Sequence, residues 1–92
     1  MLDDFRKQIE ALDAELIALL ARRFELVREI RREKSKLGLA IEDLEREEFL
    51  MTKLTELAKE QSLNPEWTEK LFNLVLEESK RIQELELGGG QP

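Results

Sequence analysis

The sequence predicts an all-α fold of three helices, one long and two shorter, that pairs with a second copy of itself. Apolar residues recur at intervals of three and four along most of the chain, and no segment alternates apolar and polar residues as a strand would. The composition, 41% apolar and 39% charged with two prolines, is typical of a long-helix protein. A chain of 92 residues buries only a modest fraction of its surface alone, which favours association.

The first helix is expected to run from Leu2 to Leu37, without an internal glycine or proline. Gly38 then provides a left-handed C-cap. At 1.5 Å per residue this helix is about 52 Å long, too long to be covered by its two shorter successors. We call its apolar face the α-stripe, and it consists of Leu2, Phe5, Ile9, Leu12, Leu16, Leu19, Leu26, Ile30 and Leu37.

The second helix is expected to begin after Asp43, a plausible N-cap, and to end near Ser62. Asn64 followed by Pro65 predicts the start of the third helix, because a capping side chain precedes a proline at the first helical position. The apolar face of the second helix comprises Leu44, Leu50, Met51, Leu54, Leu57 and Ala58, and that of the third comprises Leu71, Phe72, Val75, Ile82 and Leu85 or Glu86.

The glycines from Gly88 onward are expected to end the third helix. Residues 1–87 are therefore interpreted as one helical domain and residues 88–92 as a flexible Gly-rich tail.

Six polar residues occupy positions where these helices should be apolar. They are Arg6, Arg23 and Lys34 in the first helix, Glu47 in the second, and Ser79 and Gln83 in the third. Burying an unpaired charge costs far more free energy than burying a methyl group contributes. The pattern therefore predicts that an anion lies between the helices.

The spacing of the cations predicts that two chains build one site. Arg6 and Lys34 are 28 residues apart, about 42 Å along a straight helix, so one small ligand cannot touch both in one chain. Arg23 and Lys34 are eleven residues apart, about 16 Å and close to three whole turns, so their long side chains can grip one compact anion. Antiparallel pairing of two long helices brings Arg6 of one chain beside this stretch of the other, and symmetry creates two sites.

A simpler interpretation stays open for each of these residues. The cations of a plain antiparallel helical dimer can extend past the interface to solvent. Glu47 can merely neutralise a cation, and Ser79 can bond to the backbone of its own helix. The basic stretch Arg28 to Lys36 also contains two glutamates, which indicates that the outward members of this stretch form a solvated helix face.

The composition excludes several classes of function. The chain has no cysteine and no histidine, which removes disulfides, thiolate nucleophiles and imidazole bases. A net charge of −6 argues against a nucleic-acid partner. No signal peptide or membrane-length apolar run is visible, so a cytoplasmic protein with no membrane partner is expected.

The chain resembles the all-helical class of chorismate mutases, whose three-helix chains form intertwined homodimers. The resemblance covers nearly the whole length. It rests on Phe5-Arg6-Lys7-Gln8-Ile9, Ala11-Leu12-Asp13, Ala18-Leu19-Leu20-Ala21-Arg22-Arg23, Lys34, Asp43, Arg46-Glu47, Leu71-Phe72, Glu77, Ser79 and Gln83. Each short motif is weak alone, but together and in order they are specific. The resemblance implies an intertwined antiparallel homodimeric helical bundle.

The resemblance also implies a role for each candidate site residue. Arg23, together with Arg6 from the second chain, would hold the two carboxylates of chorismate, for which a planar donor fork is suited. Lys34 and Gln83 would donate to the ether oxygen of the breaking bond. The remaining implied contacts are Glu47 and the Asp43 region with the ring hydroxyl, Arg46 with the carboxylate end, and Ser79 with a carboxylate.

The implied reaction is the rearrangement of chorismate to prephenate, on the way to phenylalanine and tyrosine. It is pericyclic and needs no nucleophile, metal or cofactor, which suits a chain without histidine or cysteine. Two alternatives remain: a lyase of the same fold that removes pyruvate from isochorismate, and a non-catalytic helical dimerisation or regulatory module. The presence of Glu47 beside Arg46 favours the mutase over the lyase.

Overall fold

The computed structural model describes residues 1–89 of the chain, and the predicted helices are present with little change. Helix α1 spans Leu2–Leu37, α2 spans Leu44–Glu60 and α3 spans Pro65–Gly89. The prediction of an all-α chain with one long and two shorter helices is confirmed. Helix α3 continues through Gly88 and Gly89, which the sequence pattern places in the tail. The rest of that tail, residues 90–92, lies outside the described part of the chain.

Each helix boundary follows from a local signal in the sequence. Gly38 adopts a left-handed conformation with φ 72°, and its N–H and that of Leu39 donate to carbonyls of the last turn of α1. Asp43 accepts a hydrogen bond from the backbone N–H of Arg46 at 3.0 Å, so it caps α2. Asn64 Oδ1 accepts from the N–H groups of Glu66 and Trp67 and caps α3 in the same way.

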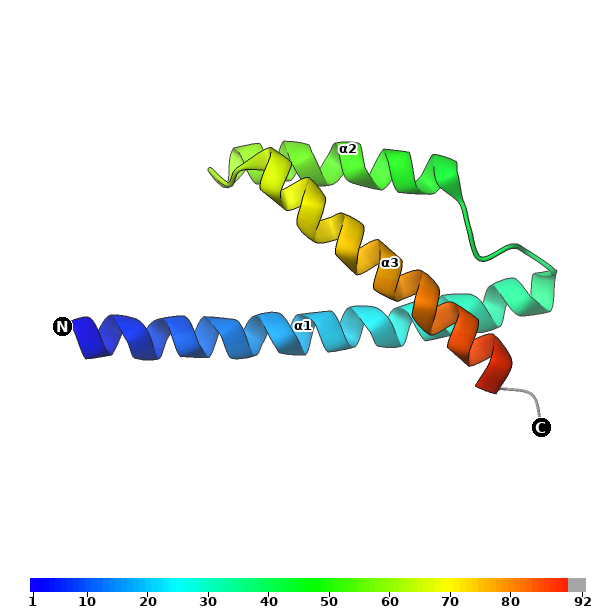
Figure 1. Ribbon diagram of the computed structural model, residues 1–92, viewed down its shortest axis with the longest axis horizontal. Coiled ribbons are helices and arrows are strands. Elements are labelled where there is room, and N and C mark those ends of the chain that lie inside the picture. Colours follow the sequence, from blue (N-terminus) through cyan, green and yellow to red (C-terminus); the bar gives the residue numbers. More distant parts are fainter. Residues whose placement is uncertain (90–92) are drawn as a thin grey trace.

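Helix α3 is the element that holds the other two together. It packs against α2 along its first part and crosses the second half of α1 along its last part, while α1 and α2 do not pack against each other within residues 1–89 (Figure 1). The buried apolar residues are correspondingly few in this part of the chain: Val27, Ala58, Val75 and Ile82.

The N-terminal end of α1 projects beyond the other helices (Figure 1). Every residue from 1 to 22 is exposed. The α-stripe residues from Leu2 to Ile30 are between 51% and 62% exposed, although they are large and apolar. A monomeric protein rarely presents so long an apolar surface to water.

The second half of α1 has two faces with different neighbours. Val27 is buried against α3, with Arg23 and Lys34 half-buried near it, whereas Leu26 and Ile30 of the α-stripe are exposed. The cations therefore face the other helices of the same chain, and Ile30 of the α-stripe borders the same space.

Candidate functional site

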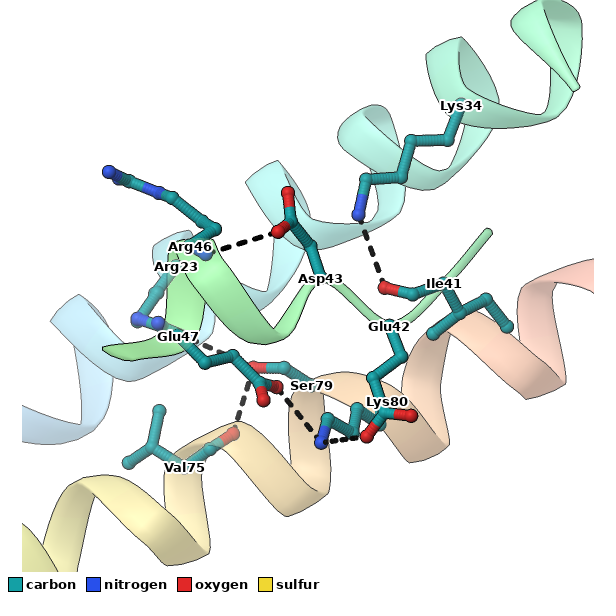
Figure 2. Close-up of polar contacts among 10 residues, drawn as sticks. All are labelled: Arg23, Lys34, Ile41, Glu42, Asp43, Arg46, Glu47, Val75, Ser79 and Lys80. Carbon is teal, nitrogen blue, oxygen red and sulfur yellow. Dashed lines mark hydrogen bonds and ion pairs between the residues drawn. The ribbon is translucent and has the colours of Figure 1, made fainter. Parts of the chain in front are cut away.

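A crevice with a volume of about 350 Å³ lies where the three helices and the segment between α1 and α2 meet. Seven of the eight residues predicted to form a site line this crevice. They are Arg23 and Lys34 from α1, Asp43 at the start of α2, Arg46 and Glu47 from α2, and Ser79 and Gln83 from α3. Figure 2 shows how most of them lie around the opening between the helices. The crevice thus brings together predicted site residues that are up to 60 positions apart in the sequence.

Arg23 is fixed at one end of the crevice by a contact between helices. Its Nη1 donates to Oγ of Ser79 at 2.8 Å (Figure 2). Burial in the crevice lowers the pKa of the Arg23 guanidinium from its ordinary value, because removing a cation from water disfavours the charged form. An arginine nevertheless stays protonated in proteins, so the charge is retained.

Ser79 uses its hydroxyl hydrogen within its own helix. Its Oγ donates to the carbonyl of Val75 at 2.8 Å and accepts from Arg23. The simpler interpretation, a bond to the backbone of its own helix, is therefore correct for this hydroxyl. Ser79 orients the guanidinium of Arg23 and has its one proton committed to the backbone in this structure.

Lys34 lies at the other end of the crevice and extends toward the segment between α1 and α2 (Figure 2). Its Nζ donates to the carbonyl of Ile41 at 3.1 Å. An ammonium has three protons, so this single contact fixes the position of Lys34 and leaves donors for a ligand.

Gln83 completes the α3 wall of the crevice. Its side chain is buried, and its Oε1 has no hydrogen-bond partner among the described residues. A buried amide oxygen without a partner is costly, which is typical of a position that a ligand or a second chain completes.

The α2 wall carries a carboxylate and a guanidinium with different surroundings. Glu47 forms an ion pair with Lys80 at 2.9 Å, so the cation that balances it is neither Arg23 nor Lys34. The Arg46 guanidinium lies 5.4 Å from the centre of the Phe49 ring, and its side chain points away from Lys34 (Figure 2). Arg46 contributes its backbone N–H to the Asp43 cap, so this pair also shapes the entrance to α2.

Arg6 lies outside the crevice of its own chain. Its side chain is 66% exposed, with one weak contact to Asp3 at 3.9 Å on the first turns of α1. This position agrees with the separation of about 42 Å expected between Arg6 and Lys34 on one helix. Its contribution to the site of a second chain stays a prediction.

Sequence reasoning missed two cations. Lys80 lines the crevice and bridges Glu42 and Glu47, and its pKa is raised chiefly by Glu47 and then by Glu42. Lys80 lies three residues before Gln83, and this spacing could have indicated that the two side chains share one face of the third helix. Arg31 belongs to the basic stretch whose outward members are predicted to be solvated, and it is not one of them. It is buried, with Nη1 donating to the carbonyl of Leu39 at 3.3 Å.

The lining of the crevice carries a net positive charge. Its lining includes four cations, Arg23, Lys34, Arg46 and Lys80, and two carboxylates, Asp43 and Glu47. Within residues 1–89, Arg23, Lys34 and Arg46 form no ion pair with a carboxylate. Cations without carboxylate partners are typical of an anion site. No cluster of carboxylates suited to a metal ion occurs in the same part of the chain.

The chain is similar to known proteins along most of its length. The family model described as chorismate mutase type II matches residues 5–84. A chorismate mutase of Methanocaldococcus jannaschii is 30% identical over 82 residues, which cover 89% of this chain and 83% of that protein.

Longer proteins match the same region. The bifunctional chorismate mutase/prephenate dehydratase of Buchnera aphidicola subsp. Schizaphis graminum is 42% identical over 79 residues, or 86% of this chain and 20% of that protein. The protein of the same description in Escherichia coli K12 is 37% identical over 79 residues, with the same coverage. The chain thus spans about a fifth of the length of these bifunctional relatives. The family model and the relative from Methanocaldococcus jannaschii together show that the chain belongs to the chorismate mutase type II family.

Proposed function

We propose that this chain is an intramolecular isomerase that converts chorismate to prephenate. The observation that carries the proposal is the crevice itself: Arg23 and Lys34 face one space from two ends, and neither has a carboxylate partner within residues 1–89. Chorismate carries two carboxylates, so it matches a site whose lining is positive. Family membership and the relatives named chorismate mutase support the same assignment.

The first contribution of the site is to restrict the substrate. The reaction breaks one carbon–oxygen bond and forms one carbon–carbon bond within the same molecule, with no net transfer of a proton or hydride. Arg23 would hold one carboxylate through its planar donor fork, and Arg6 of a second chain would hold the other. Fixing both ends holds the flexible enolpyruvyl arm over the ring, which lowers the entropic part of the barrier.

The second contribution is electrostatic. As the carbon–oxygen bond breaks, negative charge grows on the ether oxygen, so donors placed there stabilise the transition state more than the ground state. Lys34 and Gln83 would be these donors. They come from α1 and α3 and line the same crevice, which supports their action on one atom.

The α2 wall would recognise the ring. Glu47, with support from the Asp43 region, would accept the hydrogen of the ring hydroxyl, and Arg46 would reinforce the carboxylate end. Ser79 was expected to donate to a carboxylate, but its proton is bonded to Val75, so a direct donor role requires that this bond be exchanged for one to the substrate. Orienting Arg23 is the role that its contacts support here.

The functional unit would be an intertwined antiparallel homodimer. The exposed α-stripe supports this proposal, because large apolar side chains that are more than half exposed gain free energy when a second copy covers them. The distance of Arg6 from its own crevice supports a role in the crevice of the partner. A two-fold axis would give two equivalent sites.

In the cell the reaction would serve the biosynthesis of phenylalanine and tyrosine, in the cytoplasm. No helix among residues 1–89 has an apolar stretch long enough to cross a membrane.

Incubation of the purified protein with chorismate, and separately with isochorismate, tests the proposed function. Formation of prephenate from chorismate, followed by proton NMR, is the expected result. Release of pyruvate from isochorismate instead would identify the lyase of the same fold. If neither substrate is consumed, the chain is a binding or dimerisation module and the proposal fails.

A further inference from the structure

Lys80 occupies a central position in the crevice wall that the proposed reaction does not explain. It lies on α3 next to Ser79, and its Nζ is 2.9 Å from Oε1 of Glu47 and 3.1 Å from Oε1 of Glu42 (Figure 2). One ammonium thus joins α3 to α2 and to the segment that follows α1. Its side chain is 33% exposed and that of Glu47 is 23% exposed, so the pair is only partly screened by water.

The ion pair between Lys80 and Glu47 reduces a repulsion that the substrate would otherwise meet in the crevice. The proposed substrate is a dianion, and the carboxylate of Glu47 lines the space that it would enter. Two like charges close together in a partly desolvated crevice repel each other strongly. An ammonium on Oε1 offsets this repulsion and leaves Oε2, which has no hydrogen-bond partner within residues 1–89, as an acceptor.

We infer that Lys80 is a positioning residue of the site: by pairing with Glu47 it neutralises that carboxylate toward a dianionic substrate and fixes it in place as an acceptor. The inference rests on the proposed function, because it takes the substrate to be a dianion. Glu42 shares the same ammonium, and without Lys80 two carboxylates from different segments would lie close together unpaired.

The physical consequence lies in binding rather than turnover. Repulsion between Glu47 and the substrate carboxylates acts on ground state and transition state alike, so it changes KM and leaves kcat nearly constant. We expect Lys80→Met to raise KM for chorismate about tenfold, and less at high ionic strength. Lys80→Arg should restore most of the affinity, because a guanidinium can also bridge the two carboxylates. Lys70→Met, an exposed substitution on the same helix, is the matched control and should leave KM unchanged.

A double-mutant cycle with Glu47→Gln isolates the pair. In the Glu47→Gln background, Lys80→Met should change KM by less than about twofold, because no charge remains to be neutralised. An equal loss in both backgrounds would mean that Lys80 contacts the substrate directly, and no loss in either would mean that it is dispensable. Both results overturn the inference.

A measurement without substrate separates this inference from the proposed function. Ion pairing raises the pKa of Lys80, so in the ligand-free protein the titration of its Nζ, followed by nitrogen NMR, should move to lower pH in Glu47→Gln. Glu42→Gln should produce a smaller shift, because Glu47 is the stronger influence. An unchanged titration in Glu47→Gln would show that the pair does not exist in solution, even if the protein is an active mutase. If the wild type forms no prephenate, the proposed function fails while the titration still reports on the pair.

Discussion

Arg23 and Ser79 are joined by a hydrogen bond of 2.8 Å that links α1 to α3 across 56 positions of the sequence. The serine in turn is anchored to the carbonyl of Val75, so its proton direction is set by its own helix. A mobile arginine side chain is thereby held in one orientation before a ligand arrives. Such preorganisation reduces the entropy that binding must remove.

Removal of the Arg23 guanidinium should weaken substrate binding. We expect Arg23→Ala to raise KM about 10- to 100-fold, the range for losing a charge-assisted hydrogen bond. Arg23→Lys should recover little of this loss, because an ammonium cannot reproduce the planar fork. Steady-state kinetics with chorismate tests both variants, and full recovery by lysine would show that charge alone is needed at this position.

Removal of the Lys34 ammonium should lower turnover more than affinity. We expect Lys34→Ala to lose about 100- to 1,000-fold in kcat, by analogy with the loss of one oxyanion donor. Lys36→Ala removes an exposed lysine whose one ion pair within residues 1–89 is with Glu33 at 3.4 Å, and it should leave kcat unchanged. Circular dichroism checks that both variants remain helical. Turnover near that of the wild type in Lys34→Ala would rule out its role at the ether oxygen.

Replacement of Gln83 by a carboxylic acid should make the activity depend on pH. The amide donates a hydrogen bond at any ordinary pH, whereas a glutamic acid donates only when protonated. We therefore expect the kcat/KM of Gln83→Glu to rise as pH falls between about 8 and 5, while the wild type changes little over this range. A flat profile for the variant would contradict contact between Gln83 and the ether oxygen.

Disruption of the α-stripe should prevent assembly and thereby abolish activity. Leu16 is 58% exposed in a single chain, and Leu16→Asp would place a charge in the proposed interface. We expect this variant to sediment as a monomer with little activity. Ala14→Asp introduces the same charge about 200° around the helix and should remain dimeric. An active monomer in either variant would exclude a shared site.

Most of the fold could be predicted because its boundaries depend on local chemistry. Gly38, Asp43 and Asn64 end or begin helices through bonds to the nearest turns, and such bonds require no knowledge of the rest of the chain. Gly88 and Gly89 show the opposite case, since glycine is permitted in a helix as well as after it, and α3 continues through both.

The site residues could be predicted where they interrupt an apolar face, as Arg23, Lys34, Ser79 and Gln83 do. Lys80 could not be predicted in this way, because it lies beside the α3 stripe and is defined by the distance to Glu47 on another helix. Arg31 was missed for a related reason: its burial depends on how the chain folds back after Gly38, bringing the carbonyl of Leu39 within 3.3 Å. The surroundings of Lys80 and Arg31 both depend on contacts between segments that are separate in the sequence.

The central claim is that two copies pool their cations around one dianion, and subunit mixing tests it directly. Arg6→Ala and Arg23→Ala should each lose about 90% or more of kcat/KM alone, when assayed at chorismate concentrations below the wild-type KM. When the two variants are unfolded and refolded together, half of the dimers should contain one chain of each variant. In such a mixed dimer one of the two sites contains both arginines. About a quarter of all sites should therefore be intact. Recovery of about a quarter of wild-type activity is the predicted result. A mixture no more active than its components would contradict the shared site.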